Sequence, residues 1–168
     1  MAARMLVFAA MIGAASGCAG AHPQPATAAD KAPEALAPAE VIHEVEGAVE
    51  QYRQAYEVKS LDALEPLYVH GPGLVLVIQG DRKSGWQAVR NYLDGLLMAA
   101  AEIRVRVSDV SVVALGDSAA TAVATLERSV SDGTTMLSVT GTLTLVFERL
   151  GSDWKIASEH FSYAPKTP

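Results

Sequence analysis

One histidine and two tyrosines are the residues of this 168-residue chain whose types best suit proton-transfer chemistry. His160 lies near the C-terminal end in the segment WKIASEHFS, and an imidazole gains and loses a proton near neutral pH. Tyr52 and Tyr56 are one helical turn apart, so on a helix both hydroxyls would lie on one face. With the histidine as base or polariser and a tyrosine as donor, these side chains could move a proton if the fold brings them together.

The motifs of other site chemistries do not occur in the sequence. It has no glycine-rich phosphate loop, no Gly-x-Ser-x-Gly elbow, no His-x-x-x-His pair and no acidic metal-binding loop, so we expect no cofactor and no metal. A formal net charge of −6 without a run of basic residues argues against a nucleic-acid partner. Cys18 is the single cysteine, which excludes an internal disulfide.

The N-terminal residues resemble a bacterial lipoprotein signal. An apolar stretch too short to cross a membrane as a helix ends in ASGC, which is similar to a lipobox. We therefore expect a signal peptide over residues 1–17, a lipid on Cys18 and an Ala/Pro-rich tether over residues 18–39. This predicts an exported, membrane-anchored protein on the periplasmic or outer surface, and on the outer membrane in a Gram-negative host. A plain secretory peptide with an incidental cysteine is the alternative.

Hydrophobic periodicity predicts helices first and strands afterwards. Apolar residues from Val41 to Tyr56 recur at helical spacing, and Ser60 can cap a short second helix. The run LVLVIQ is typical of a strand, and the stripe from Trp86 to Leu97 indicates a third helix. Val- and Thr-rich runs then alternate with turn signals, which predicts a four-strand antiparallel meander. Because long strands twist and curl, we expect an α+β fold in which a bent sheet packs on three N-terminal helices.

Four segments carry a resemblance to a known family: EQYRQAYEVKSLDALEPLY, SGWQAVRNYL, LGDSAAT and WKIASEHFS. In this order they resemble the nuclear transport factor 2-like superfamily, and within it the SnoaL-like and ketosteroid-isomerase-like domains. The resemblance implies a domain over residues 40–164, a tail over residues 165–168, and a cone-shaped curved antiparallel sheet with one or two short strands beside the meander. The superfamily includes isomerases, polyketide cyclases, dehydratases and non-catalytic binding or assembly domains, so the fold leaves the function open.

One position departs from the enzymes of that superfamily. They usually place an aspartate base near the end of the second helix. Here that neighbourhood runs from Leu67 to Pro72, and no carboxylate follows Glu65 in it. An aspartate-based mechanism is therefore not expected.

The turn signals set which side chains face the helices. A two-residue loop at Asp132-Gly133 pairs Leu126 with Val139, and a turn from Leu150 to Asp153 pairs Leu143 with His160. The more apolar sheet face should line the core. In this register Glu127 and Glu159 fall on the opposite face, which a single β-bulge would invert. The expected cavity-lining residues are Trp86, Ala122, Ala124, Leu126, Arg128, Gly141, Leu143, Trp154, Ile156, Ser158, His160 and Ser162.

The small residues around His160 have two interpretations. They leave space either for a ligand or for a neighbouring aromatic side chain, in which case Tyr52, Tyr56 or Trp86 fills the gap and hydrogen-bonds the imidazole. The leading hypothesis is a membrane-displayed domain that binds a small apolar molecule without catalysis. The alternatives are an isomerase, cyclase or dehydratase that uses His160, and a module that assembles through a Thr-rich outer sheet face. A homodimer is compatible with all three.

Overall fold

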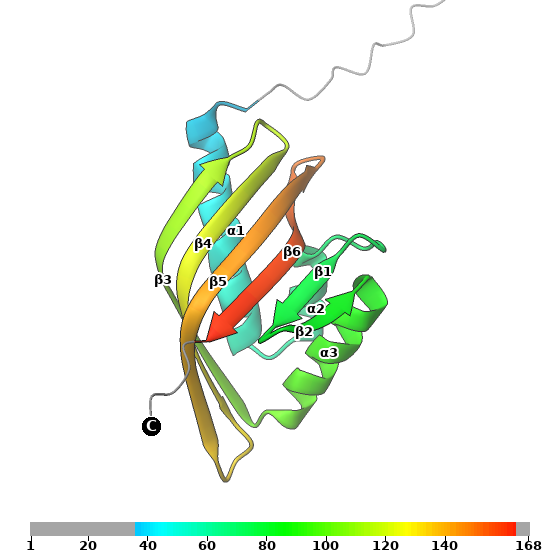
Figure 1. Cartoon of the computed structure of the whole chain (residues 1–168), viewed down its shortest axis with the longest axis vertical. Coiled ribbons are helices and arrows are strands. Elements are labelled where there is room, and N and C mark those ends of the chain that lie inside the picture. The colour runs from blue at the N-terminus through cyan, green and yellow to red at the C-terminus, as the bar shows by residue number, and fades with distance from the viewer. Residues whose placement is uncertain (1–35, 164–168) are drawn as a thin grey trace, which may run out of the picture. The chain divides into compact units, whose positions relative to one another are not determined.

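The computed structural model describes residues 36–163, which form three helices and one six-stranded sheet (Figure 1). The helices are α1 (Pro38–Glu57), α2 (Leu61–Leu64) and α3 (Trp86–Ala99), with a 3₁₀ turn, η1, at Glu65–Leu67. The strands are β1 (Val75–Ile78), β2 (Asp81–Ser84), β3 (Glu102–Ala114), β4 (Ala119–Ser131), β5 (Met136–Leu150) and β6 (Asp153–Tyr163). The predicted signal peptide, Cys18, most of the predicted tether and the predicted tail lie outside the described residues.

The sheet is open and has the order β2-β1-β6-β5-β4-β3. The long strands β3 to β6 pair as successive antiparallel neighbours, which confirms the predicted meander. β1 and β2 are the additional short strands, and β1 runs parallel to β6. α1 crosses one face of the sheet, while α3 packs mainly against β2 and α2 at one side of it (Figure 1). The α+β fold class is therefore confirmed.

The apolar face of α1 forms the middle of the core. Proline in its first turn and the Glu40 carboxylate, which accepts a hydrogen bond from the Ala37 amide at 3.0 Å, favour a helix start at this point. The buried residues follow the predicted helical spacing and are Val41, Val45, Ala48, Val49, Tyr52, Ala55 and Tyr56. No helix in the described part of the chain has the length and apolarity that a membrane crossing requires.

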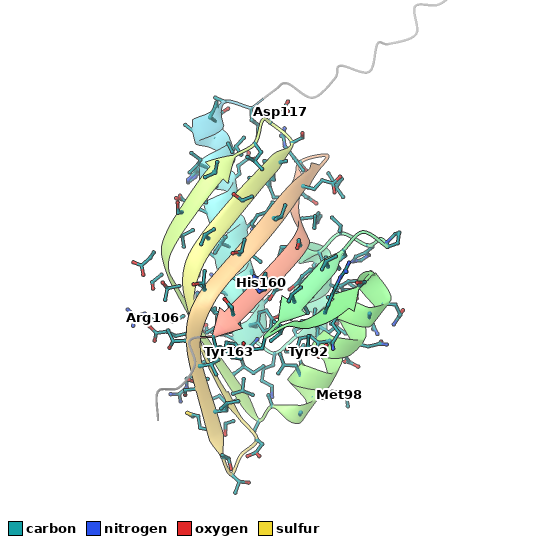
Figure 2. All side chains as sticks on the ribbon, viewed as in Figure 1. Tyr92, Met98, Arg106, Asp117, His160 and Tyr163 are labelled. Carbon is teal, nitrogen blue, oxygen red and sulfur yellow. The ribbon has the colours of Figure 1, made fainter. Side chains whose placement is uncertain are left out.

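A β-bulge in β6 reverses the faces of its C-terminal half. Phe147 pairs with Ile156, but Val146 pairs with Ser158, so Ala157 has no partner. Side chains alternate with a period of two, and one additional residue therefore exchanges the two faces. Beyond the bulge, Glu159 turns toward the helices, whereas His160 turns to the exposed face that lies away from α1 (Figure 2). The predicted pairing of Leu143 with His160 is wrong, because Leu143 pairs with Phe161.

The loop between β4 and β5 also differs from the prediction, but without reversing any face. The last pair before the loop is Ser131 with Met136, so the loop has four residues instead of two. Leu126 consequently pairs with Gly141, two positions along β5 from its predicted partner Val139. A shift by two keeps every side chain on its predicted side.

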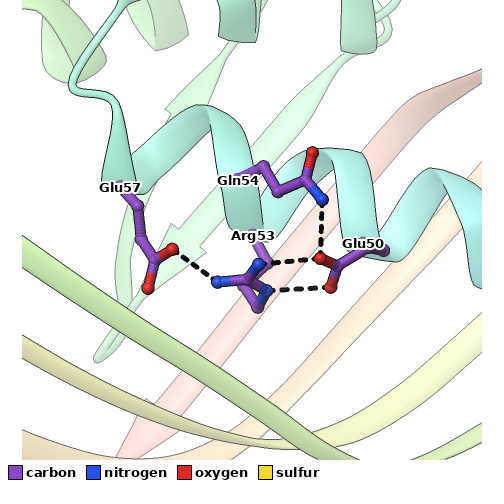
Figure 3. Close-up of polar contacts among 4 residues, drawn as sticks. All are labelled: Glu50, Arg53, Gln54 and Glu57. Carbon is purple, nitrogen blue, oxygen red and sulfur yellow. Dashed lines mark hydrogen bonds and ion pairs between the residues drawn. The ribbon is translucent and has the colours of Figure 1, made fainter.

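The solvent face of α1 has a small ionic cluster. Arg53 donates to both Glu50 and Glu57, and Gln54 donates to Glu50 at 2.7 Å (Figure 3). Hydrogen bonds from Arg53 and then Gln54 lower the pKa of Glu50 to about 2. Exposed pairs at this helical spacing contribute little to stability, so the buried face of α1 determines its position.

Candidate functional site

A carboxyl group with no exposed surface, that of Glu159, lies between α1 and the sheet. The Tyr52 hydroxyl of α1 donates to its Oε1 at 2.7 Å, and the Tyr68 hydroxyl, directly after η1, donates to its Oε2 at 2.6 Å. Burial raises the pKa of Glu159, while the hydrogen bonds from Tyr68 and Tyr52 and the charge of Arg128 oppose that rise. The described structure thus holds an acid in its core whose protonation is easier than that of an exposed glutamate.

Arg128 of β4 supplies the positive charge of this region. It is 6% exposed, and its Nη2 donates to the Tyr163 hydroxyl at 2.9 Å. Its Cζ lies 5.3 Å from the centre of the Phe161 ring, a cation–π distance. Its Nε is buried and has no hydrogen-bond partner among the described residues. One donor of a permanently charged group is therefore unused.

The chain has five tyrosines, and all of them belong to this region. We call the group the tyrosine cluster: Glu159, Arg128, Tyr52, Tyr56, Tyr68, Tyr92 and Tyr163. The ring centres of Tyr52 and Tyr56 are 4.9 Å apart. The Tyr56 hydroxyl is buried without a hydrogen-bond partner within residues 36–163. The Tyr68 hydroxyl is close enough to affect the pKa of Tyr56, which burial and then Glu159 raise, but it is not in hydrogen-bond geometry.

Exposure increases along the inner face of the sheet, from Glu159 toward the loop between β4 and β5. Glu159 is 0% exposed and Arg128 6%, whereas Val139, the cross-strand partner of Arg128, is half-buried. Leu137, two positions further along β5, is 58% exposed. From the other side α3 contributes the half-buried Tyr92, at the same level of the domain as Tyr163 (Figure 2). The tyrosine cluster therefore has one closed end and one end near solvent.

This arrangement supports two kinds of chemistry. Unused donors on a buried arginine and tyrosine can bind an acceptor oxygen of a ligand. A buried carboxyl group with a raised pKa, held by two phenol donors, can also accept or donate a proton in a reaction. Each oxygen of Glu159 accepts one hydrogen bond and keeps a second lone pair, so the carboxylate can accept a proton while Tyr52 and Tyr68 hold it in place.

The predicted position of His160 on the inner face of the sheet is wrong. The imidazole is exposed on the sheet face away from α1, and the bulge also turns Ser158 and Ser162 away from the helices. Tyr52 and Tyr56 are buried as expected, but Tyr52 donates to Glu159 rather than to the imidazole. The inference of a ligand next to His160 therefore loses its basis.

Gly141 does not leave a hollow either. A Cβ atom at this position would overlap the carbonyl oxygen of Ser162 and lie 2.8 Å from the Cα of Tyr163, so the backbone of β6 fills the space. Trp86 lies at the start of α3, where its ring is 4.4 Å from that of His70 and stacked on it. The remaining residues of the predicted lining are buried: Ala122, Ala124, Leu126, Arg128, Leu143, Trp154 and Ile156.

The sequence contains a pattern from which the inward position of the Glu159 carboxyl group could have been predicted. Trp154 and Ile156 are apolar at even positions, whereas Phe161 and Tyr163 are apolar at odd positions. A strand that keeps one face buried can change parity only through an additional residue. This change predicts a bulge between Ile156 and Phe161, and with it an inward-facing Glu159.

A separate groove lies on the surface beside α1. It has a volume of about 670 Å³ and is bordered by Gln51 and Ala55 of α1, by Leu67, and by Trp154 and Lys155 of β6. None of its lining residues belongs to the tyrosine cluster. Within residues 36–163 no group of three or more His, Cys, Asp or Glu side chains could hold a metal ion.

Comparisons with known proteins agree with this fold. The model of the SnoaL-like domain family matches residues 45–166. A candidate dehydratase of the nuclear transport factor 2-like family from Streptomyces avermitilis superposes with a TM-score of 0.70 at 22% identity, over 76% of this chain and 99% of that one. A nuclear transport factor 2-like superfamily protein from Salmonella enterica gives 0.70 at 16% identity, over 77% and 95%. A candidate scytalone dehydratase from Novosphingobium aromaticivorans gives 0.68 at 11% identity, over 75% and 85%.

At these identities the solved structures establish the fold alone. A search of curated protein sequences found no match. The family model spans well over half of the chain, and it covers α1 from Val45 onward together with every strand of the sheet. The chain therefore belongs to the SnoaL-like domain family.

Proposed function

We propose that this SnoaL-like domain binds a small, largely apolar molecule at the solvent-facing end of the tyrosine cluster, without converting it. The observation that carries the proposal is the change along the inner face, from exposed Leu137 through half-buried Val139 to buried Arg128. An apolar approach that ends on a few convergent polar groups is the usual composition of a small-molecule site. Leu96 and Tyr92 of α3, both half-buried, would cover the other side of the ligand.

The unused donors argue for a ligand rather than for a purely structural network. Buried polar groups in native proteins nearly always have hydrogen-bond partners. In the tyrosine cluster, each oxygen of Glu159 accepts a hydroxyl, whereas the Arg128 Nε and the Tyr56 hydroxyl have no partner among the described residues. A network that served only to stabilise the core would need neither group.

A thermal-shift screen with naphthalene-sized aromatics and steroids tests this proposal. A ligand at a hundred times its Kd should stabilise the domain by about 2.7 kcal/mol. We expect Leu137→Asp to reduce the affinity for every hit, because it puts a charge next to the apolar part of the bound ligand. Met136→Asp is the matched control, since Met136 is 52% exposed but points to the opposite face of the same strand. A screen without hits, or an equal loss of affinity in both variants, would contradict the proposal.

Catalysis is the second candidate function, in which Glu159 rather than His160 is the base. The favouring observation is a buried carboxyl group with a raised pKa between two phenol donors. In an isomerase or dehydratase reaction this group would remove a proton next to a carbonyl group, with Arg128 stabilising the oxyanion. Turnover of a model β-hydroxy ketone should disappear in Glu159→Gln and remain in His160→Ala. Turnover that survives in Glu159→Gln would exclude this mechanism.

The placement of the domain is also a proposal. We infer that Cys18 carries a lipid and that the domain is displayed from a membrane surface, on the basis of the lipobox-like ASGC segment. Labelling of cells with a radioactive fatty acid should mark the wild-type chain and not Cys18→Ser.

We also propose that the domain forms a homodimer through the outer sheet face, which carries Thr142 and Thr144. Light scattering of a concentrated sample tests this assembly.

A further inference from the structure

Two buried donors in the tyrosine cluster have no acceptor in the part of the chain that the structure describes, and they lie on different elements. The Arg128 Nε comes from β4, and the Tyr56 hydroxyl comes from α1. Each group influences the other electrostatically, so they lie in one region of the core. Arg128 is 6% exposed and Tyr56 1% exposed, so bulk water does not satisfy them.

We propose that the polar end of the ligand is a carboxylate, which the Arg128 guanidinium binds with the Tyr56 hydroxyl as a second donor. This deepens the proposed binding function and depends on it. Both unused groups are donors, so the complementary atom is an acceptor. A planar guanidinium forms its strongest hydrogen bonds with carboxylate oxygens, in which both partners are charged. The ligand class is thus an apolar or aromatic body with one carboxylate.

The charges around the site favour an anion of this kind. The titratable groups that face it are Tyr52 and Tyr56 from α1, Tyr68 after η1, Tyr92 from α3, Arg128 from β4, and Glu159 and Tyr163 from β6. Burial raises the pKa of the tyrosines on α1 and α3 and of Tyr68 directly after η1, which keeps them neutral. Arg128 and Glu159 are therefore the two groups of the tyrosine cluster that carry charge.

Carboxylate binding should consequently take up a proton at Glu159. With Glu159 ionised, the cluster is neutral, and an incoming carboxylate would add an unpaired negative charge in the core. With Glu159 protonated, the ligand becomes the counter-ion of Arg128. Burial raises the pKa of this carboxyl group, which is the direction that proton uptake on binding requires. Affinity should then increase as the pH falls toward the pKa of Glu159, by at most about tenfold per pH unit for a single proton.

Calorimetric titration with 2-naphthoate and its neutral amide, 2-naphthamide, tests the proposal. We expect 2-naphthoate to bind about 10- to 100-fold more tightly at pH 6, the range for a hydrogen bond to a charged group. Arg128→Met should abolish this preference, and Tyr56→Phe should reduce it. The matched control is Arg149→Met, because the Nε of Arg149 is also buried without a partner among the described side chains but lies on β5, outside the tyrosine cluster. Glu159→Gln should bind 2-naphthoate with little dependence on pH.

The outcomes separate the two proposals. If both probes bind equally and Arg128→Met changes neither, the carboxylate inference is wrong and the proposed binding function remains. If neither probe nor any other apolar compound binds, the binding function itself is wrong. A preference for 2-naphthoate that Arg149→Met removes would place the anion elsewhere and overturn the inference. Should Arg128→Met fail to fold, Tyr56→Phe decides, because it removes only a hydroxyl that has no partner in the described structure.

Discussion

Replacing Glu159 by leucine should lower the free energy of unfolding by about 3–5 kcal/mol, the cost of removing one member of a buried charged network. Leucine fills a similar volume, so the effect comes from the partners that remain. The Tyr52 and Tyr68 hydroxyls lose their acceptor, and the Arg128 charge loses the carboxylate beside it. Urea denaturation followed by circular dichroism measures this loss.

The neighbouring residue is the control. His160→Ala should change stability by less than about 0.5 kcal/mol, because His160 is exposed on the other face of the same strand. A larger loss for His160→Ala than for Glu159→Leu would mean that the bulge at Ala157 is absent and that the register predicted from the turns applies.

A comparison of two tyrosines on α1 tests whether the loss of stability comes from the hydrogen bonds to Glu159. Tyr52 and Tyr56 are both 1% exposed, yet Tyr52 donates to Glu159 and Tyr56 donates to nothing in the described structure. Tyr52→Phe should cost about 1.5–3 kcal/mol, as for other hydrogen bonds to a charged group. Tyr56→Phe should be neutral or slightly stabilising. Equal losses in both variants would contradict the assigned network.

Most of the fold could be predicted because its elements are periodic and their turns are explicit. The apolar spacing in α1 and the Gly-containing turns between β3, β4, β5 and β6 determine the order of elements and the antiparallel meander. The four-residue loop after Ser131 shifted the pairing of β5 by two, an error that leaves the buried face unchanged. Face assignments on β4 and β5 tolerate such errors in loop length.

The site could not be predicted in the same way, because it depends on a single residue. Ala157 exchanges the faces of everything after it, so the same rule that placed Trp154 and Ile156 correctly placed His160 and Glu159 wrongly. Glutamate is seldom fully buried unless it is paired. The partners of Glu159 are Tyr52 and Tyr68, which are 107 and 91 positions away in the sequence. Sequence patterns within one element do not contain such a pairing.

The second large effect concerns Gly141, where we expect alanine to cost about 3 kcal/mol or more, at the upper end for overpacking. Here β6 passes so close to β5 that an added Cβ would overlap the carbonyl oxygen of Ser162, with the Cα of Tyr163 at 2.8 Å. Backbone atoms cannot rotate away as a flexible side chain can. The end of β6 must therefore shift, and Tyr163, which accepts a hydrogen bond from Arg128, shifts with it.

Gly95→Ala is the matched control, and its expected sign is opposite. Gly95 lies inside α3 with nothing within 4 Å of an added Cβ, so alanine should stabilise the domain by about 0.5–1 kcal/mol. Thermal unfolding of the two variants should thus move the Tm in opposite directions. Wild-type stability in Gly141→Ala would show that β6 does not approach β5 this closely. The contact between Tyr163 and Arg128 would then be wrong as well, and with it the position of the guanidinium in the proposed carboxylate site.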